Sequence, residues 1–363
     1  MGTSVAVPRP LCYRSRNVCF PQDLLQREGL TLTAHQLDVI GFGNAIVDVI
    51  ARSDEAFLAT HDMRKGGMTL IDEARAGTVY GAMGPGVEIS GGSAANTMVG
   101  IAALGGRSGF IGKVRDDELG GIFAHDINAA GVAFATPAAS EGPTTARCLI
   151  LVTPDGERTM NTYLGAAQDL RPEDVDEAMV ASARVTYLEG YLWDQPAAKQ
   201  AFLKAAKIAH GANRTVTLTL SDAFCVGRYR AEFLELLRNG TVDLVFANES
   251  ELMSLYETDF DQALGLLTED VSRAVVTRSE KGALSVSGDT LVEVPAFPVA
   301  KVVDTTGAGD LFAAGYLHGH ARGFSPEESL RLGALCASEI ISHIGARPER
   351  SLVEMAREQG LRV

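Results

Sequence analysis

Short apolar segments alternate with longer amphipathic segments along most of the chain, and this alternation limits the possible folds more than any other feature. Glycines such as Gly131 and Gly211 stand where the amphipathic segments would end as helices. Strands that alternate with helices form parallel sheets covered on both faces. We therefore predict a three-layer α/β/α domain with a central, mostly parallel sheet. Strands are expected at residues 37–41, 108–111, 185–188, 215–220, 244–247 and 274–277, and helices at residues 97–104, 119–130, 196–210, 229–239, 249–256, 311–319 and 326–341.

Two segments interrupt this alternation. Residues 146–160 read ARCLILVTPDGERTM, which is typical of two strands joined by a Pro-Asp-Gly turn. Residues 49–71 contain GGMTLI and have no strong helical stop. We expect these pieces, about residues 49–71 and 134–163, to form a small β-sheet that lies over the active face as a lid.

The start of the chain differs in composition from the rest. The first 22 residues carry Arg9, Arg14, Arg16 and three prolines, and the first acid is Asp23. An Arg-rich, acid-poor segment is typical of a transit peptide, but this one lacks a clear amphipathic face. We interpret residues 1–36 as a disordered leader or as the product of a start codon placed too far upstream. Residues 37–363 are expected to form the folded domain.

The net charge and the cysteines exclude several classes of protein. The chain has 32 Lys and Arg against 46 Asp and Glu, a formal net charge of −14, which argues against a protein whose main task is to grip nucleic acid. No apolar run approaches the ~18 residues of a membrane span. The five cysteines include no C-x-x-C pair, so neither a disulfide framework nor a zinc site is indicated. We expect a cytoplasmic protein with small-molecule partners and no nucleic-acid or membrane partner; the sequence does not determine the oligomeric state.

Two glycine-rich segments look like nucleotide-binding motifs but lack required residues. The segment that starts at Gly41 has Ile46 where a dinucleotide-binding loop needs its third glycine. Gly112-Lys113 would end a P-loop, but Val114 stands where Ser or Thr must bind Mg²⁺. We reject both motifs.

The segment Asp304-Thr-Thr-Gly-Ala-Gly-Asp310 follows an expected strand end and runs directly into a helix. Gly307 and Gly309 can adopt backbone angles closed to other residues. The N–H groups at a helix N-terminus form an anion site that the helix dipole strengthens. A carboxylate beside such a site, here Asp310, suits the removal of a proton from an attacking hydroxyl. The alternative is that Asp310 only caps the helix.

A second pair of polar residues follows the strand expected at residues 244–247. Asn248 and Glu251 are three residues apart in a first helical turn, where oxygen ligands face the same way and suit Mg²⁺, directly or through its waters. The alternative is a helix capping box made by the same two residues, and the two interpretations are compatible. Thr277 and Gly282 lie at a strand end and a glycine turn that would support a nucleotide.

Residues near the front of the chain provide polar groups for an acceptor. Gly91 and Gly92 precede a helix, where glycine lets a ligand approach the backbone, and Asn96 offers an amide to paired hydroxyls. Asn44 and Asp48 lie in an apolar run, where they are costly to bury without partners. A diol is one such partner. The alternative is a structural Asp48 that accepts hydrogen bonds from backbone N–H groups.

Together these residues resemble the PfkB, or ribokinase-like, family of carbohydrate and nucleoside kinases, from about residue 37 to the C-terminus. The family signature D-T-x-G-A-G-D is met at every fixed position by Asp304–Asp310. The front end, Gly43-Asn44-Ala-Ile-Val-Asp48, is most similar to the adenosine kinase branch. The resemblance implies a ribokinase-like fold and an ATP- and Mg²⁺-dependent kinase that phosphorylates the 5′-hydroxyl of a ribonucleoside, with adenosine to AMP in purine salvage as the main expectation. A sugar kinase of the ribokinase or fructokinase type and a non-catalytic nucleotide-binding homologue are the alternatives.

The resemblance also implies a role for each motif residue. The base is Asp310, and the anion hole is Gly307, Ala308 and Gly309. Asn248 and Glu251 place Mg²⁺ and phosphate. The substrate-binding residues are Asn44, Asp48, Gly91, Gly92, Ser93 and Asn96.

Two features of the family are less well defined in this sequence. A monovalent cation such as K⁺ near Asp304 is a family property. Adenosine kinases also stack an aromatic side chain on the base, and no residue here is assigned to that position. Tyr163, Tyr191 and Trp193 are the candidates.

Overall fold

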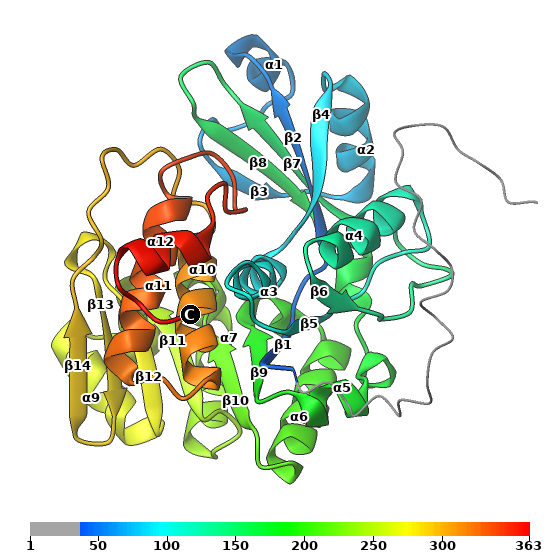
Figure 1. Cartoon of the computed structure of the whole chain (residues 1–363). Coiled ribbons are helices and arrows are strands. Elements are labelled where there is room, and N and C mark those ends of the chain that lie inside the picture. The colour runs from blue at the N-terminus through cyan, green and yellow to red at the C-terminus, as the bar shows by residue number, and fades with distance from the viewer. Residues whose placement is uncertain (1–36) are drawn as a thin grey trace, which may run out of the picture. The chain divides into compact units, whose positions relative to one another are not determined.

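The structure, a computed structural model, describes residues 37–363, so the expectations for residues 1–36 lie outside the described residues. Within this part of the chain, a nine-stranded sheet forms the centre (Figure 1). All neighbouring strands from β12 to β6 pair in parallel, while β13 and β14 add an antiparallel edge. The predicted mostly parallel sheet is confirmed. In spatial order its strands are β14 (Thr290–Val294), β13 (Ala283–Ser287), β12 (Arg273–Thr277), β11 (Leu244–Asn248), β10 (Thr215–Thr219), β9 (Val185–Glu189), β1 (Val39–Phe42), β5 (Ser108–Ile111) and β6 (Val132–Phe134).

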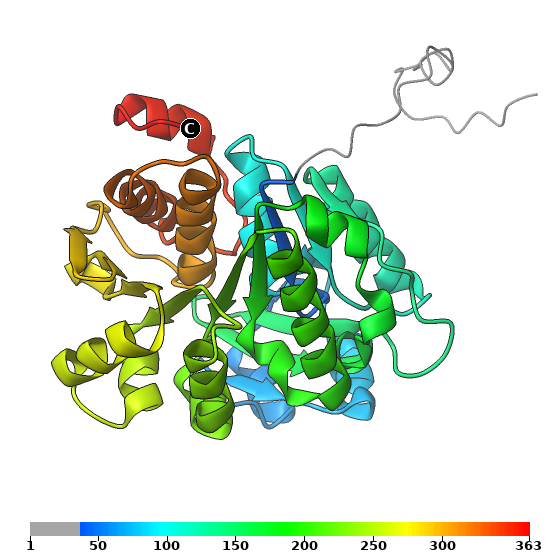
Figure 2. The same ribbon diagram turned by 90° about the horizontal axis from the view of Figure 1, so that it is seen from below.

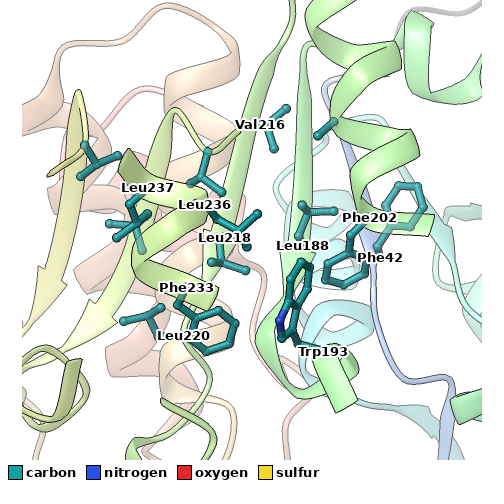
Figure 3. Close-up of a cluster of buried hydrophobic side chains, with 14 of the residues drawn as sticks. Phe42, Leu188, Trp193, Phe202, Val216, Leu218, Leu220, Phe233, Leu236 and Leu237 are labelled. Carbon is teal, nitrogen blue, oxygen red and sulfur yellow. The ribbon is translucent and has the colours of Figure 1, made fainter. Parts of the chain in front are cut away.

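Helices cover both faces of this sheet (Figure 2), as the alternation predicts. On one face, Phe202 and Phe233 pack with Leu188 and Leu218 in a fully apolar layer (Figure 3). Burying one such side chain contributes about 1.5–3 kcal/mol, so this layer fixes the sheet against its helices. The helices of this face are α5 (Glu177–Ser182), α6 (Pro196–Gly211), α7 (Ala223–Arg238), α8 (Glu249–Tyr256) and α9 (Phe260–Asp270). The other face carries α3 (Ser93–Ala103), α4 (Glu118–Ala129), α10 (Ala308–Ala321) and α11 (Pro326–Ile340), and α12 (Leu352–Glu358) packs on α11.

A second, five-stranded sheet lies beyond the carboxyl end of β1 (Figure 1). The chain leaves β1 at Phe42 and enters this sheet at Ile46, so only three residues connect the two sheets there. The predicted hairpin is present as an antiparallel pair, β7 and β8. The order is β3 (Met68–Leu70), β8 (Arg158–Tyr163), β7 (Ala146–Val152), β2 (Ile46–Arg52) and β4 (Gly86–Gly91), with the short helices α1 (Glu55–Thr60) and α2 (Glu73–Ala82) between its strands in the sequence.

The segments expected to form this small sheet contribute most of it. Residues 49–71 hold the end of β2, the helix α1 and the strand β3, and residues 134–163 hold β7 and β8. The strand β4, with the sequence GVEISG, lies outside both segments. From the sequence we expect only glycines before a helix there, so this strand is not predicted. The expected strand end at residues 301–303 is also absent, since these residues are irregular.

The described residues contain no helix with the length and apolar character that membrane crossing requires. Three of the cysteines lie within residues 37–363, and all three are unpaired and buried.

Candidate active site

A cleft of about 350 Å³ opens at the carboxyl ends of the parallel strands, beside the N-termini of α8 and α10. In α/β sheets this edge is where ligands bind. Seven of the residues predicted from the sequence line the cleft: Ser93, Asn248, Glu251, Thr277, Gly307, Gly309 and Asp310. Sequence reasoning missed its polar residues Thr219 and Ser221, because single Ser and Thr residues at strand ends carry no motif. Thr305, which also lines the cleft, belongs to the signature Asp304–Asp310 but had no role assigned to it.

The N-terminus of α10 forms an anion site in this cleft. Gly307 is its N-cap and has φ 78°, a left-handed conformation that strains any residue with a side chain. The N–H groups of Gly307, Gly309 and Asp310 have no hydrogen-bond partner among residues 37–363, whereas Ala308 N–H donates to the Thr305 carbonyl at 3.2 Å. The unpaired N–H groups and the dipole of α10 therefore favour an anion here.

Asp310 does not cap α10, because the N-cap is Gly307 and Asp310 is the third residue of the helix. Its carboxylate is held instead by α3: Ser93 Oγ donates to Oδ1 at 2.6 Å and Asn96 Nδ2 donates to Oδ2 at 3.1 Å. Burial raises the pKa of Asp310, and the two hydrogen bonds and the Arg347 charge oppose that rise. A fixed carboxylate with a raised pKa beside an anion site is suited to general-base catalysis.

Asn96 is the second predicted residue that contacts Asp310. It is buried, and its Oδ1 has no partner among the described residues although its amide nitrogen is used. A buried acceptor without a partner costs about 1–3 kcal/mol, so a ligand donor at this point would remove the penalty. The geometry fits the predicted contact with a hydroxyl.

Glu189 is a site residue that the sequence did not indicate. It lies at the carboxyl end of β9 and accepts hydrogen bonds from Asn44 Nδ2 at 2.7 Å and Ala94 N at 2.8 Å. Burial raises the pKa of Glu189 to about 7. Asn44 is thus engaged with a protein carboxylate, and Glu189 fixes both the link between the two sheets and the start of α3. The available signal was an acid at the end of a fully buried strand.

Asp48 lies in the middle of β2, opposite Ile89 on β4 and Cys148 on β7. It is half-buried, and its carboxylate makes no hydrogen bond within residues 37–363, so the alternative of backbone N–H partners is wrong. Burial raises the pKa of Asp48 to about 6, against the lowering effects of Arg347 and Arg158. A Cβ at Gly91 would come within 2.4 Å of Asp48 Oδ2, so the glycine provides space for this carboxylate. Gly92 likewise leaves room for the Asn44 carbonyl.

Asn248 and Glu251 form the capping box of α8. Asn248 N donates to Glu251 Oε2 at 2.9 Å, and Glu251 N donates to Asn248 Oδ1 at 2.9 Å. Burial raises the pKa of Glu251 to about 7. Because these oxygens already accept protein donors, the pair fits Mg²⁺ through its waters better than through direct bonds, which is the usual way Mg²⁺ is held beside phosphates. No group of three or more His, Cys, Asp or Glu that could hold a metal occurs in the described part of the chain. Thr277 lines the same cleft, but Gly282 lies in the turn before β13, outside the lining residues.

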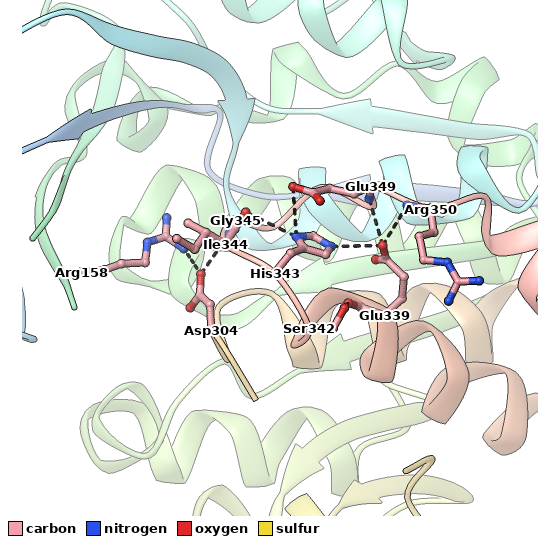
Figure 4. Close-up of polar contacts among 9 residues, drawn as sticks. All are labelled: Arg158, Asp304, Glu339, Ser342, His343, Ile344, Gly345, Glu349 and Arg350. Carbon is pink, nitrogen blue, oxygen red and sulfur yellow. Dashed lines mark hydrogen bonds and ion pairs between the residues drawn. The ribbon is translucent and has the colours of Figure 1, made fainter. Parts of the chain in front are cut away.

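Asp304 does not fit a direct monovalent-cation ligand. Its Oδ1 accepts from Thr306 N at 2.9 Å, and its Oδ2 accepts from Gly345 N at 3.0 Å and from the guanidinium of Arg158 (Figure 4). Burial tends to raise the pKa of Asp304, but these N–H donors and the Arg158 charge hold it below its usual value. Both oxygens are thus engaged, and a positive charge is already supplied by β8.

Of the three aromatic candidates for stacking, only Tyr191 lines the cleft. The ring of Trp193 lies in the core, 5.8 Å from Phe202 and 6.2 Å from Phe233, so its candidacy is wrong. Tyr163 is buried under the Arg147 guanidinium, 5.7 Å from its ring centre.

An anion site at a helix N-terminus, with a carboxylate fixed beside it at the carboxyl edge of a parallel sheet, defines a phosphotransferase that acts on an alcohol group. The chain belongs to the PfkB family, because residues 72–351 match the family model described as pfkB family carbohydrate kinase. ATP is accordingly its expected phosphoryl donor.

Similar proteins come from more than one branch of this family. Adenosine kinase 1 of Arabidopsis thaliana is 25% identical over 341 residues, 86% of this chain and 96% of that protein. An ATP-dependent ribose-1-phosphate kinase of Halopiger xanaduensis is 31% identical over 258 residues, 71% of this chain and 82% of the relative. The crystal structure of adenosine kinase from Sinorhizobium meliloti is 56% identical, with a TM-score of 0.83, and covers 89% of this chain and 99% of that one. A probable sugar kinase from Rhizobium etli is 52% identical, with a TM-score of 0.83 and coverage of 90% and 99%. The ribokinase-like fold is therefore confirmed.

Proposed function

We propose that this enzyme transfers the γ-phosphoryl group of ATP to the 5′-hydroxyl of adenosine and forms AMP. The observation that carries the proposal is the half-buried Asp48 carboxylate, which has no hydrogen-bond partner among the described residues. A cis-diol provides two donors for such a carboxylate, and charge-assisted hydrogen bonds of this type are the strong ones. The 56% identity to the Sinorhizobium adenosine kinase supports a ribonucleoside as the source of that diol.

The chemistry follows from residues of the chain. Asp310 takes the proton of the 5′-hydroxyl, while Ser93 and Asn96 keep its two oxygens in place. The free N–H groups at the start of α10 stabilise the charge on the transferring phosphoryl group. Mg²⁺ neutralises charge on the phosphate oxygens in such transfers, and Asn248 and Glu251 would hold its waters. Closure of the second sheet over the cleft would exclude water, so that ATP is not hydrolysed.

The test is a coupled ATP assay with adenosine, 2′-deoxyadenosine, ribose and fructose. Adenosine is expected to be the best acceptor, and 2′-deoxyadenosine to lose much of its kcat/KM because it leaves the Asp48 carboxylate without a partner. The variant Asp48→Ala removes that discrimination together with most of the activity. Free ribose is expected to be poor, because it lacks the base contacts that help to position the 5′-hydroxyl.

A sugar kinase is the second candidate function, favoured by the fructokinases among the relatives and by the absence of an assigned stacking residue. If ribose or fructose outruns every nucleoside in the assay, the adenosine proposal fails and Asp48 binds sugar hydroxyls instead. A cytoplasmic location remains a prediction that cell fractionation would check.

A further inference from the structure

Arg347 lies in the segment between α11 and α12, outside every motif discussed above. Its Nη2 donates to the carbonyl of Ser90 and, at 2.9 Å, to the Ser90 hydroxyl. Ser90 is fully buried on β4, and both its N–H and its hydroxyl donate to Asp126 Oδ2 of α4, at 2.8 and 2.5 Å. One arginine therefore connects the C-terminal segment to a strand of the second sheet and, through that strand, to α4.

These hydrogen bonds use only one side of the guanidinium. The Nη1 atom of Arg347 is shielded from solvent and has no hydrogen-bond partner among residues 37–363. Leaving a donor of a charged group buried and unpaired is costly. Replacement by an uncharged residue that kept the Ser90 bonds would avoid this cost, so hydrogen bonding alone does not account for an arginine here.

The surroundings of Arg347 account for the positive charge. Arg347 binds Ser90, and the next residue, Gly91, lies against the Asp48 carboxylate, since a Cβ there would meet both of its oxygens. Ser93 and Asn96, just beyond, bind the Asp310 carboxylate, so the guanidinium is held on the segment that contacts both carboxylates. Burial raises the pKa of Asp48 and of Asp310, and the Arg347 charge opposes both rises. The other groups that bear on the two carboxylates are Arg158, Cys148, Tyr187 and Glu189.

We propose that Arg347 is a positioning residue that ties β4 to the C-terminal segment and supplies the positive charge that lets Asp48 and Asp310 remain ionised together. Asp48 and Asp310 repel each other, and both must be negative if one binds a diol while the other takes a proton. This inference rests on the proposed roles of these two carboxylates. Arg347 itself takes no part in the proton transfer.

The test compares the pH dependence of kcat/KM in Arg347→Gln, Arg347→Lys and Arg350→Gln. The last is a matched control, because the Arg350 side chain forms only an exposed ion pair with Glu358 at 3.6 Å. The acid limb of the plot of kcat/KM against pH is expected to shift to higher pH by at least about one unit in Arg347→Gln. Loss of a nearby opposite charge raises a carboxyl pKa by that order. Arg347→Lys is expected to restore most of the wild-type limb, and Arg350→Gln to overlay it.

A purely structural role would give a different result. Arg347→Gln and Arg347→Lys would then lose rate equally at all pH values, with the acid limb unmoved, and this outcome would overturn the proposal. Ser90→Ala separates the two roles, because it removes a hydrogen-bond partner and keeps the charge. It is expected to lower the melting temperature and leave the limb in place; a displaced limb in Ser90→Ala would also count against the charge role.

A substrate-free measurement keeps this inference distinct from the proposed function. The carboxyl groups of Asp48 and Asp310 are titrated by ¹³C NMR in wild-type protein and in Arg347→Lys and Arg347→Gln, with signals assigned from Asp48→Asn and Asp310→Asn. Higher midpoints for both groups in Arg347→Gln support the inference even if adenosine proves not to be the acceptor. Unchanged midpoints overturn it even if adenosine is phosphorylated. If Arg347→Gln does not fold, the uncharged variant Arg347→Met takes its place in the same titration.

Discussion

The Asp310 carboxylate accepts a 2.6 Å hydrogen bond from the Ser93 hydroxyl, so the first residue of α3 orients a carboxylate in the first turn of α10. These residues are 217 positions apart in the sequence. Glu189 in turn fixes the start of α3 through Ala94 N, which makes the position of the base depend on three separate elements. Rigid support of this kind is what a proton transfer requires, because a small displacement of the base is expensive in rate.

Replacing Asp310 by Asn should keep the fold and ATP binding and lower kcat by at least ~10², the low end for a general base. Asn retains the size of the side chain and one acceptor for Ser93 but cannot take a proton. Steady-state kinetics with a calorimetric ATP titration measures both effects. Asp261→Asn, an exposed acid in the first turn of α9, is the control and should behave as wild type. Near-normal turnover by Asp310→Asn would leave the residue without a catalytic role.

Glu251→Gln should raise the Mg²⁺ concentration needed for half-maximal rate, because the change removes a charge next to the waters of the metal. It should also lower the melting temperature, since Asn248 Nδ2 now donates to Glu251 Oε1 at 2.5 Å and would face an amide donor. Glu328→Gln is the matched control for Glu251→Gln, because Ser325 and Glu328 form the same kind of capping box on α11. The control should leave the Mg²⁺ titration unchanged. If Glu251→Gln does the same, the pair serves only as a cap.

Gly91→Ala should weaken binding of the acceptor nucleoside without changing the affinity for ATP. The new Cβ would lie 2.4 Å from Asp48 Oδ2 and displace that carboxylate. Loss of one charged hydrogen-bonding group costs about 1.5–3 kcal/mol, so kcat/KM for the nucleoside should fall by about 10- to 100-fold. Gly81→Ala, which meets nothing within 4 Å on α2, provides the comparison. Equal ATP dissociation constants with a lower nucleoside affinity would support the placement of Asp48, and an unchanged KM would contradict it.

The enzyme should not depend on K⁺. Arg158 already supplies a positive charge to Asp304, whose oxygens are both engaged by N–H donors. Replacement of K⁺ by tetramethylammonium at constant ionic strength should leave kcat unchanged. Arg158→Ala should lose activity, and added methylguanidinium should restore part of it. A wild-type rate that requires K⁺ would show that a cation binds this loop through other atoms.

His318 should make stability depend on pH. It is fully buried on α10, and burial, with the nearby Arg322 charge, lowers its pKa from 6.5 to about 4, while Asp38 opposes this shift. Between these two pKa values the folded state binds fewer protons than the unfolded state, so the free energy of unfolding falls as the pH drops from 6.5 toward 4. Above pH 6.5 the ring is neutral in both states and adds no pH dependence. The loss should reach a few kcal/mol, at about 1.4 kcal/mol per pKa unit.

Chemical denaturation of wild type and His318→Asn across this pH range checks the effect. The difference in unfolding free energy between the two proteins should shrink as the pH falls from 6.5 to 4. A constant difference would mean that the His318 ring is protonated in the fold.

The features that were predictable from sequence are those set by neighbours along the chain. Apolar periodicity gave the parallel strands and the covering helices, and the Pro-Asp-Gly turn gave the β7–β8 hairpin. The Gly307 nest could be predicted because its glycine conformation and its helix start lie within a few residues. Local patterns of this kind depend on hydrophobic period and backbone sterics alone.

The features that were missed depend on contacts between distant segments. Arg158 and Asp304 are 146 residues apart, and Arg347 and Ser90 are 257 apart, so no local pattern relates either pair. Trp193 was misjudged for the same reason: a Trp just after a strand can face a cleft or the core, and only the packing of Phe202 and Phe233 decides.

The proposed acceptor residues, Asn44 to Asn96, belong to the first third of the chain, while the anion site and the magnesium-side pair belong to residues 248–310. The hydrogen bonds between these two groups of described residues join Ser93 and Asn96 of α3 to Asp310 of α10. Substitutions in the first segment other than at Ser93 and Asn96 can therefore change the alcohol that the enzyme accepts while the catalytic base keeps its hydrogen bonds. Separate segments for acceptor binding and for phosphoryl transfer thus provide a physical route by which one lineage diversifies into kinases for nucleosides and for sugars.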